Sequence, residues 1–308
     1  MTLLTTEQVL TKLRQGESFE QAELSSIDLQ SSRLDQGNFT GAYLRRANLQ
    51  AASCQETNFS HALLYFALLC KSNLVRANLT LARCNNAQFE LANLRSVNAY
   101  KTNFREASMP RVEAVLGQFP QAIFIDVKGE EANFSSANLK GAYLQQSNFN
   151  RANFAAARLR QADFTSAILT HTLWHQADLE QAILIQANLE GADFSQANLI
   201  SANLQGAKLQ RVLFKGAEVQ QANLSQAKLV TVDFTETSLF GVNLEGALLS
   251  QVSLMGADLR DANLEKTTWE GVTFGNCQVS GAEFTDAQGL SAPQKKWLKQ
   301  HGALNVPA

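Results

Sequence analysis

Hydrophobic and polar positions recur along this chain with a period of five residues. Residues 192–194 read Ala-Asp-Phe, and residues 197–199 and 202–204 both read Ala-Asn-Leu. Most fifth positions hold a large apolar residue, Leu or Phe, and the residue two places before it is small, in most cases Ala. The residue between them is often Asn or Asp, and the two that follow are mostly polar.

A period of five matches neither the 3.6 residues of an α-helix nor the two residues of a flat strand. The chain must therefore turn after every repeat. If each repeat forms one side of a coil, strand alternation points the large residue and the small residue two places earlier into the interior. Pairing large with small fills a narrow interior without voids. The polar positions are left for corners and solvent.

These repeats resemble the A(D/N)LXX motif of the pentapeptide-repeat family, from near Ala22 to near Phe284. The resemblance implies an all-β solenoid, a right-handed quadrilateral parallel β-helix with four repeats per coil.

Aromatic residues support this 20-residue coil independently, because stacked coils would place them beside one another. We expect Phe154, Trp174, Phe194 and Phe214 to form one inward ladder. Every fourth large position from residue 134 onward is aromatic with one exception: Phe134, Phe154, Trp174, Phe194, Phe214, Phe234, Leu254 and Phe274.

Both ends of the chain are predicted to be short helical caps, which cover the open ends of a solenoid. Residues 1–18 form the N-terminal cap, with Thr6 before the helix and Gly16 ending it. Residues 289–308 form the C-terminal cap and tail, where Ser291 begins a capping box and Trp297 is the candidate plug.

The β-helix is expected to span residues 19–288, with an irregular coil or loop near residues 105–131. Pro110 and Pro120 lie in that stretch, and Pro cannot donate a hydrogen bond to a strand ladder.

Composition is typical of a folded chain without a strong electrostatic preference. Apolar residues make up 45% and charged residues 18%, and the net charge is −2. Neither nucleic acid nor a membrane is therefore an expected partner. The first 16 residues lack the basic and apolar pattern of a signal peptide, so we expect a cytoplasmic protein with reduced cysteines.

Catalytic and metal-binding patterns are absent from the sequence. The only pair of histidines at a ligand-like spacing is His171 and His175, and both fall at outward positions of the coil region. No phosphate-binding loop or nucleophile motif occurs. We expect no enzymatic activity, cofactor or metal.

Large apolar residues break the polarity rule of the repeat near residue 65, where they occupy outward positions. Such a patch at the surface of a soluble protein is typical of a protein interface, and aromatic and Arg residues often dominate the binding energy there. The candidate binding residues are Tyr43, Arg45, Arg46, Leu63, Tyr65, Phe66 and Leu68.

These observations favour a non-catalytic adaptor or regulator that binds another protein, as a monomer or an end-to-end dimer. The alternative, implied only by the family resemblance, is a DNA mimic that binds a type II topoisomerase. That function requires a strongly acidic face. The chain has a local surplus of basic residues between residues 40 and 111, which disfavours it.

The inward and outward assignments are testable at neighbouring positions. We expect Leu204→Asp to unfold several coils, because it replaces about 1.5–3 kcal/mol of apolar burial with a charge. Asn203→Asp should be tolerated, since that position faces outward. Thermal unfolding of the two variants provides the measurement, and equal melting temperatures would contradict the assignment.

Overall fold

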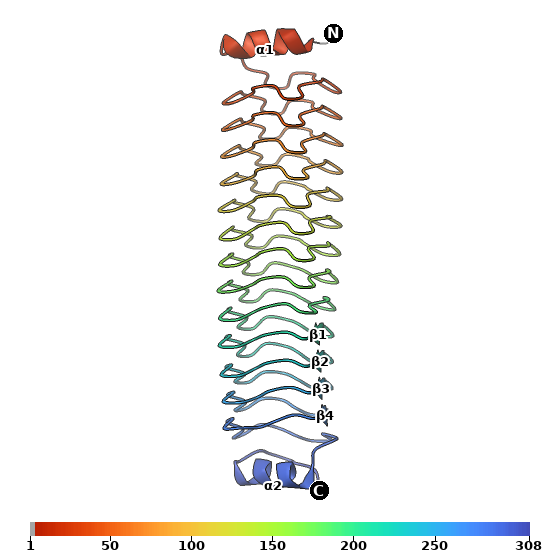
Figure 1. Cartoon of the computed structure of the whole chain (residues 1–308), viewed down its shortest axis with the longest axis vertical. Coiled ribbons are helices and arrows are strands. Elements are labelled where there is room, and N and C mark those ends of the chain that lie inside the picture. Colours follow the sequence, from red (N-terminus) through yellow and green to blue (C-terminus); the bar gives the residue numbers. More distant parts are fainter. Residues whose placement is uncertain (1–3) are drawn as a thin grey trace. The chain divides into compact units, whose positions relative to one another are not determined.

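The structure, a computed structural model, describes residues 4–308 as two compact units, residues 4–158 and Leu159–Ala308. In each unit the chain forms coils of 20 residues with four sides. One residue on each side pairs in parallel with the residue 20 positions later, as Tyr43 does with Leu63 in the first unit. Each unit is thus a right-handed quadrilateral β-helix, as the repeat predicts (Figure 1).

Most sides contain a single bridging residue, and longer strands occur on one side of the second unit. These strands are parallel and paired in chain order, and each begins 20 residues after the last. Their bounds are β1 Lys208–Gln210, β2 Lys228–Val230, β3 Leu248–Ser250 and β4 Thr268–Glu270 (Figure 1).

A tight turn follows each large residue. At a representative turn, the Ala197 amide donates to the Phe194 carbonyl over 2.9 Å, and Gln196 has a φ of 60°. A positive φ at the third residue is the requirement of a type II turn. For a non-glycine residue this conformation costs about 1–2 kcal/mol. The Gln196 amide donates in turn to Lys215 on the next coil, so the strained residue also joins the ladder between coils.

The interior holds the large and small residues of the repeat. Both Ala202 and Leu204 are fully buried, as the alternation predicts. Aromatic rings stack along the coils in each unit: Phe134 and Phe154 lie 5.5 Å apart in the first unit, and Trp174 and Phe194 lie 5.4 Å apart in the second. These stacked pairs confirm four repeats per coil.

Buried tryptophans bring a polar indole N–H into this apolar interior. The side chain at the small position two residues earlier accepts a hydrogen bond from it. Trp174 Nε1 donates to Thr172 Oγ1 over 2.7 Å, and that hydroxyl donates to the Leu169 carbonyl over 2.6 Å. Trp269 and Thr267 repeat the arrangement. Thr at the small position therefore removes the cost of an unpaired buried donor.

The structure does not contain the irregular coil or loop expected near residues 105–131, because bridging continues regularly through that stretch. Pro110 and Pro120 each follow a buried large residue and occupy the second position of a turn. Pro is favoured there, since its fixed φ suits the turn. At this turn position the backbone amide makes no hydrogen bond between coils. The amide of the next residue does: Arg111, which follows Pro110, donates to the Glu130 carbonyl. Proline therefore costs no hydrogen bond between coils.

Gly129 occupies a large-residue position without leaving a void. A Cβ at this residue would lie only 2.2 Å from the ring of Phe149, the residue 20 positions later. The ring of the next coil therefore fills the space that the missing side chain leaves open.

The N-terminal cap is helix α1, Thr6–Arg14, and its N-cap is Thr5 instead of the expected Thr6. Thr5 Oγ1 accepts from the Gln8 amide, and Gln8 Oε1 accepts from the Thr5 amide, which completes a capping box. The Thr6 hydroxyl instead donates to the Asp28 carbonyl over 2.6 Å and so ties the helix to the coils.

The C-terminal cap is helix α2, Ala292–Gln300, with the expected capping box at Ser291. Leu298 is its fully buried residue, whereas the expected plug, Trp297, is half-buried and contacts the ring of Phe274. After the helix, Leu304 pairs with Glu283 and extends the ladder of that side. Of the helices described between residues 4 and 308, none is long and apolar enough to span a membrane.

The turn geometry predicts that proline has opposite effects on stability at two neighbouring turn positions. Lys215→Pro should change stability by less than about 0.5 kcal/mol, because it places Pro at the same turn position as Pro110. Gln221→Pro should cost about 3 kcal/mol or more, because Gln221 has a φ of 57° and its amide donates to Phe240. Urea unfolding of both variants measures the difference, and similar losses would contradict the turn assignment.

Candidate protein interface

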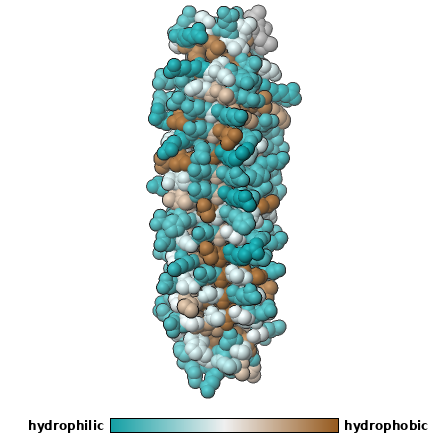
Figure 2. All heavy atoms as spheres, in the orientation of Figure 1, coloured by the Kyte–Doolittle hydropathy of each residue, from teal (hydrophilic) through white to brown (hydrophobic). Residues whose placement is uncertain are grey.

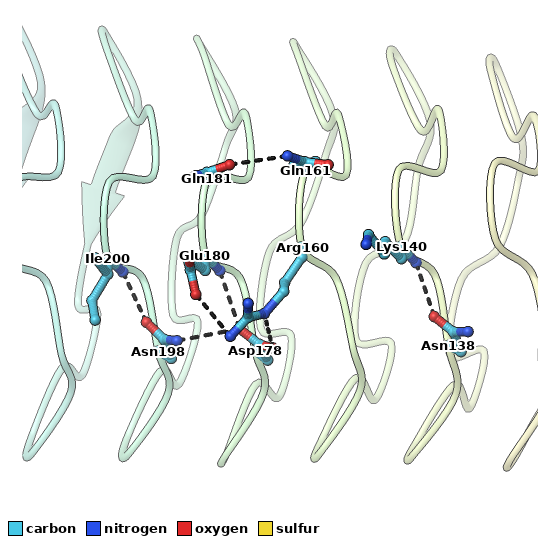
Figure 3. Close-up of polar contacts among 9 residues, drawn as sticks. All are labelled: Asn138, Lys140, Arg160, Gln161, Asp178, Glu180, Gln181, Asn198 and Ile200. Atoms are coloured by element: carbon cyan, nitrogen blue, oxygen red, sulfur yellow. Dashed lines mark hydrogen bonds and ion pairs between the residues drawn. The ribbon is translucent and has the colours of Figure 1, made fainter.

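Ordinary outward positions of this chain hold polar side chains that bond to the coils. In the second unit, Asn198 Oδ1 accepts from the Ile200 amide over 3.0 Å, and its Nδ2 donates to Asp178 over 3.2 Å (Figure 3). One Asn thus caps its own turn and contacts the preceding coil. Arg160 adds ion pairs to Asp178 and Glu180 in the same view.

Asn side chains at outward positions also connect to one another. Asn223 Nδ2 donates to Asn203 Oδ1 over 3.2 Å, and Asn243 continues the series over 3.3 Å. Such a ladder satisfies polar groups within the molecule and leaves few of them for a partner.

The outward residues near residue 65 form a different surface, which we name the Tyr43–Leu68 patch. Tyr43 pairs with Leu63 on the next coil, and Tyr65 and Phe66 follow Leu63 at the corner. Tyr43 is 45% exposed and Phe66 is 44% exposed. Leu68 is half-buried and lies on the following side, so the patch wraps one corner. It comprises Tyr43, Arg45, Arg46, Leu63, Tyr65, Phe66 and Leu68.

Arginines surround this apolar surface. Arg45 and Arg46 are exposed, and among residues 4–308 neither forms an ion pair. Arg83, which the sequence did not single out, pairs with Leu63 on the backbone and donates to Tyr65 Oη over 3.2 Å. This hydrogen bond raises the pKa of the Arg83 guanidinium, which stays charged beside the ring.

Several other arginines of the first unit form ion pairs. Arg76 pairs with Glu56, Arg111 with Glu90, and Arg105 with Asp126. Arg45 and Arg46 therefore differ from these arginines, although Glu23, which pairs with Tyr43 on the preceding coil, places one carboxylate at the edge of the patch.

A second apolar group was missed from the sequence. Ile123 pairs with Tyr143, which is 47% exposed, and Ile125 lies beside Ile123 at the following turn position. The 20-residue period could have revealed this group from the sequence. Ile123 and Tyr143 lie at multiples of 20 residues from Tyr43 and Leu63, so they occupy the same outward position on later coils. Figure 2 shows apolar groups among the polar surface in the part of the first unit that it displays.

The titratable side chains of the described residues form no metal-binding cluster. Between residues 4 and 308, no group of three or more His, Cys, Asp or Glu side chains could hold a metal ion. Burial raises the pKa of the Cys54 and Cys84 thiols and raises that of Cys277 to about 11, so these thiols are poor nucleophiles. His171 and His175 are exposed.

The chain belongs to the pentapeptide-repeat family, whose matches together cover more than half of it. The family described as pentapeptide repeats matches in eight copies, at residues 22–53, 72–109, 177–216, 217–256 and 253–288, and the pentapeptide repeat region matches residues 117–194.

Solved structures include similar repeat proteins. HetL from the cyanobacterium Nostoc sp. strain PCC 7120, involved in heterocyst differentiation regulation, is 21% identical over 92% of this chain and 98% of its own, with a TM-score of 0.33. Rfr23 from Cyanothece 51142 is 31% identical over 31% of this chain and 63% of its own, with a TM-score of 0.20. Full-length QnrB1, a plasmid-mediated fluoroquinolone resistance protein, is 17% identical over 91% and 98%, with a TM-score of 0.28. None of the curated proteins matches significantly.

Proposed function

We propose that this protein is a non-catalytic adaptor or regulator that binds another protein through the Tyr43–Leu68 patch. The observation that carries the proposal is the exposure of Tyr43 and Phe66 on a surface where most outward positions are polar. Exposed aromatic clusters of this kind mark interaction sites, because burying them against a partner removes apolar area from water.

Charge around the patch indicates the chemistry of the partner. In the described part of the chain Arg45 and Arg46 form no ion pair, and the Arg83 guanidinium donates to Tyr65. A complementary segment would combine apolar side chains, which cover Tyr43 and Phe66, with carboxylates that pair with these arginines. A nucleic-acid mimic requires the opposite sign of charge, so a topoisomerase that binds DNA is the weaker candidate partner.

The scaffold suits recognition because it holds the patch in place. The Leu63 amide donates to Ala42 on one neighbouring coil over 2.9 Å, and the Leu64 amide donates to Arg83 on the other over 2.8 Å. The backbone beneath the patch is thus bonded on both sides. Binding to a preorganised surface costs little ordering entropy. The cytoplasmic location expected from the sequence stays a prediction.

The proposal is tested by a double substitution. Tyr65→Ala with Phe66→Ala should weaken binding of the native partner by about 2 kcal/mol or more, because aromatic anchors carry a large share of interface energy. The partner is first captured from the native cell with the tagged wild-type protein, and its affinity for each variant is then measured by calorimetry.

Asn203→Ala with Asn223→Ala is the control, since it removes outward side chains distant in sequence from the patch. Circular dichroism would establish that both double variants remain folded. Undiminished affinity of the Tyr65 and Phe66 variant would sink the proposal, and a loss of similar size in the control would show that the patch is not selective.

A further inference from the structure

The last coil of the second unit has an open strand edge on one of its four sides. This side contains Ser253 and Thr273, which pair in parallel on successive coils. In the coil beneath, two amides donate to the last coil. Leu254 donates to the Thr273 carbonyl over 3.2 Å. Gly256 donates to the Gly275 carbonyl over 2.8 Å.

The equivalent donors of the last coil are the amides of Phe274 and Asn276. Between residues 4 and 308 neither amide has a hydrogen-bond partner. The carbonyls of the same edge are already bonded. Val272 accepts from Gln294 Nε2 over 2.9 Å, and Phe274 accepts from the Cys277 amide over 3.4 Å. The edge therefore presents two free donors, two residues apart, and its acceptors are occupied.

An apolar pocket lies beside these amides, between the last coil and helix α2, which follows at this end of the unit (Figure 1). Phe274 occupies an inward, large position but is only half-buried, whereas Phe234 on the same side is fully buried. The half-buried Trp297 contacts the Phe274 ring, with the two centroids 5.9 Å apart. The pocket has a volume of about 470 Å³ and is lined by Val272, Thr273, Phe274, Gly275, Pro293, Gln294 and Trp297.

Another side of the same end shows how such an edge is completed. After α2 the chain returns to the coils, and Leu304 pairs in parallel with Glu283. Phe284, the large residue of that side, donates its amide to the Leu304 carbonyl over 3.0 Å. This is the bond that the Phe274 amide lacks. The part of the chain that the structure describes supplies no such segment to the side of Thr273.

We infer that this edge binds an extended segment of another protein, which adds to the side of Thr273 as a parallel strand. Two carbonyls of the segment, at positions i and i+2, accept from the Phe274 and Asn276 amides. The side chain between them, at position i+1, faces the core by strand alternation and enters the pocket against Phe274 and Trp297. The ligand is therefore a peptide with one large apolar residue, Leu or Phe, between two residues that face outward.

The free groups of the edge select this kind of occupant. A small apolar ligand fills the pocket but leaves both amides unpaired, whereas a strand satisfies them. Two copies of the chain that met through this same edge would oppose donors to donors. The peptide residue at position i need not donate its amide, because Gln294 already bonds to the Val272 carbonyl. Proline is therefore allowed at that position.

A peptide that copies residues 230–237 of this chain, with both ends blocked, is the probe. This segment already forms a strand of the same side, where the Asp233 carbonyl accepts from the Phe214 amide and the Phe234 ring is fully buried. It therefore carries a large residue at position i+1. Calorimetric titration of the full chain should give saturable binding with a Kd on the order of 100 μM, since a short peptide loses ordering entropy when it binds.

Hydrogen exchange of the Phe274 and Asn276 amides distinguishes strand addition from filling of the pocket alone. Both amides should exchange about tenfold more slowly, or slower still, at saturating peptide, because they gain hydrogen bonds. Nuclear magnetic resonance of the isotope-labelled full chain gives each rate. Binding without this protection would overturn the inference.

Side-chain specificity is tested on both molecules. The same peptide with Ala in place of its Phe should bind about tenfold more weakly or worse, because the pocket stays empty. Trp297→Ala should weaken binding of the unaltered peptide similarly, whereas Trp297→Phe should retain most of it. Thermal melts should show both protein variants folded. Equal affinity of the two peptides for the wild-type protein would contradict the pocket assignment.

The remaining outcomes also decide the inference. Absence of binding up to about 1 mM peptide would overturn it. Protection of both amides at rising protein concentration without peptide would assign the edge to a second copy, and so would refute it as well. The Tyr43–Leu68 patch belongs to the first unit, so Tyr65→Ala with Phe66→Ala should leave peptide binding unchanged. Either site can therefore fail its test without affecting the other.

Discussion

Parallel hydrogen bonding between residues 20 positions apart is the constraint on which the rest of each unit depends. It holds only if the chain turns after every fifth residue. Those turns place residues such as Gln196 in a left-handed conformation that costs about 1–2 kcal/mol at a non-glycine residue. The same residue donates its amide to the next coil, so the ladder stabilises the conformation that makes it possible. Breaking one coil therefore removes support from its neighbours.

Packing and polarity both follow from this ladder. Side chains at a given position stack on their counterparts one coil away, which brings Trp174 against Phe194 inside and Asn223 against Asn203 outside. An Asn at an outward position is satisfied by its own turn and by the neighbouring coil. Large apolar residues at such positions gain neither contact. This contrast is the physical basis for the binding role proposed for Tyr43 and Phe66.

The stacked register also gives a surface a readable order along the coils. On the side that contains Tyr43, this order is Glu23, Tyr43, Leu63, Arg83, Asn103, Ile123 and Tyr143. Among residues 4–308, Arg45 and Arg46 form no ion pair, which is why the proposed partner is expected to present carboxylates to them.

The sequence by itself determined the coil, because the inward and outward alternation is a local property that repeats every five residues. The spacing of the aromatic residues determined that four repeats form a coil. Only the tertiary structure revealed the contacts between side chains and backbone groups that lie one coil, or 20 residues, apart. It showed that Pro110 costs no bond between coils, that Phe149 fills the space at Gly129, and that Arg83 joins the patch through Tyr65. Each of these facts concerns a contact between coils, and no local pattern in the chain contains it.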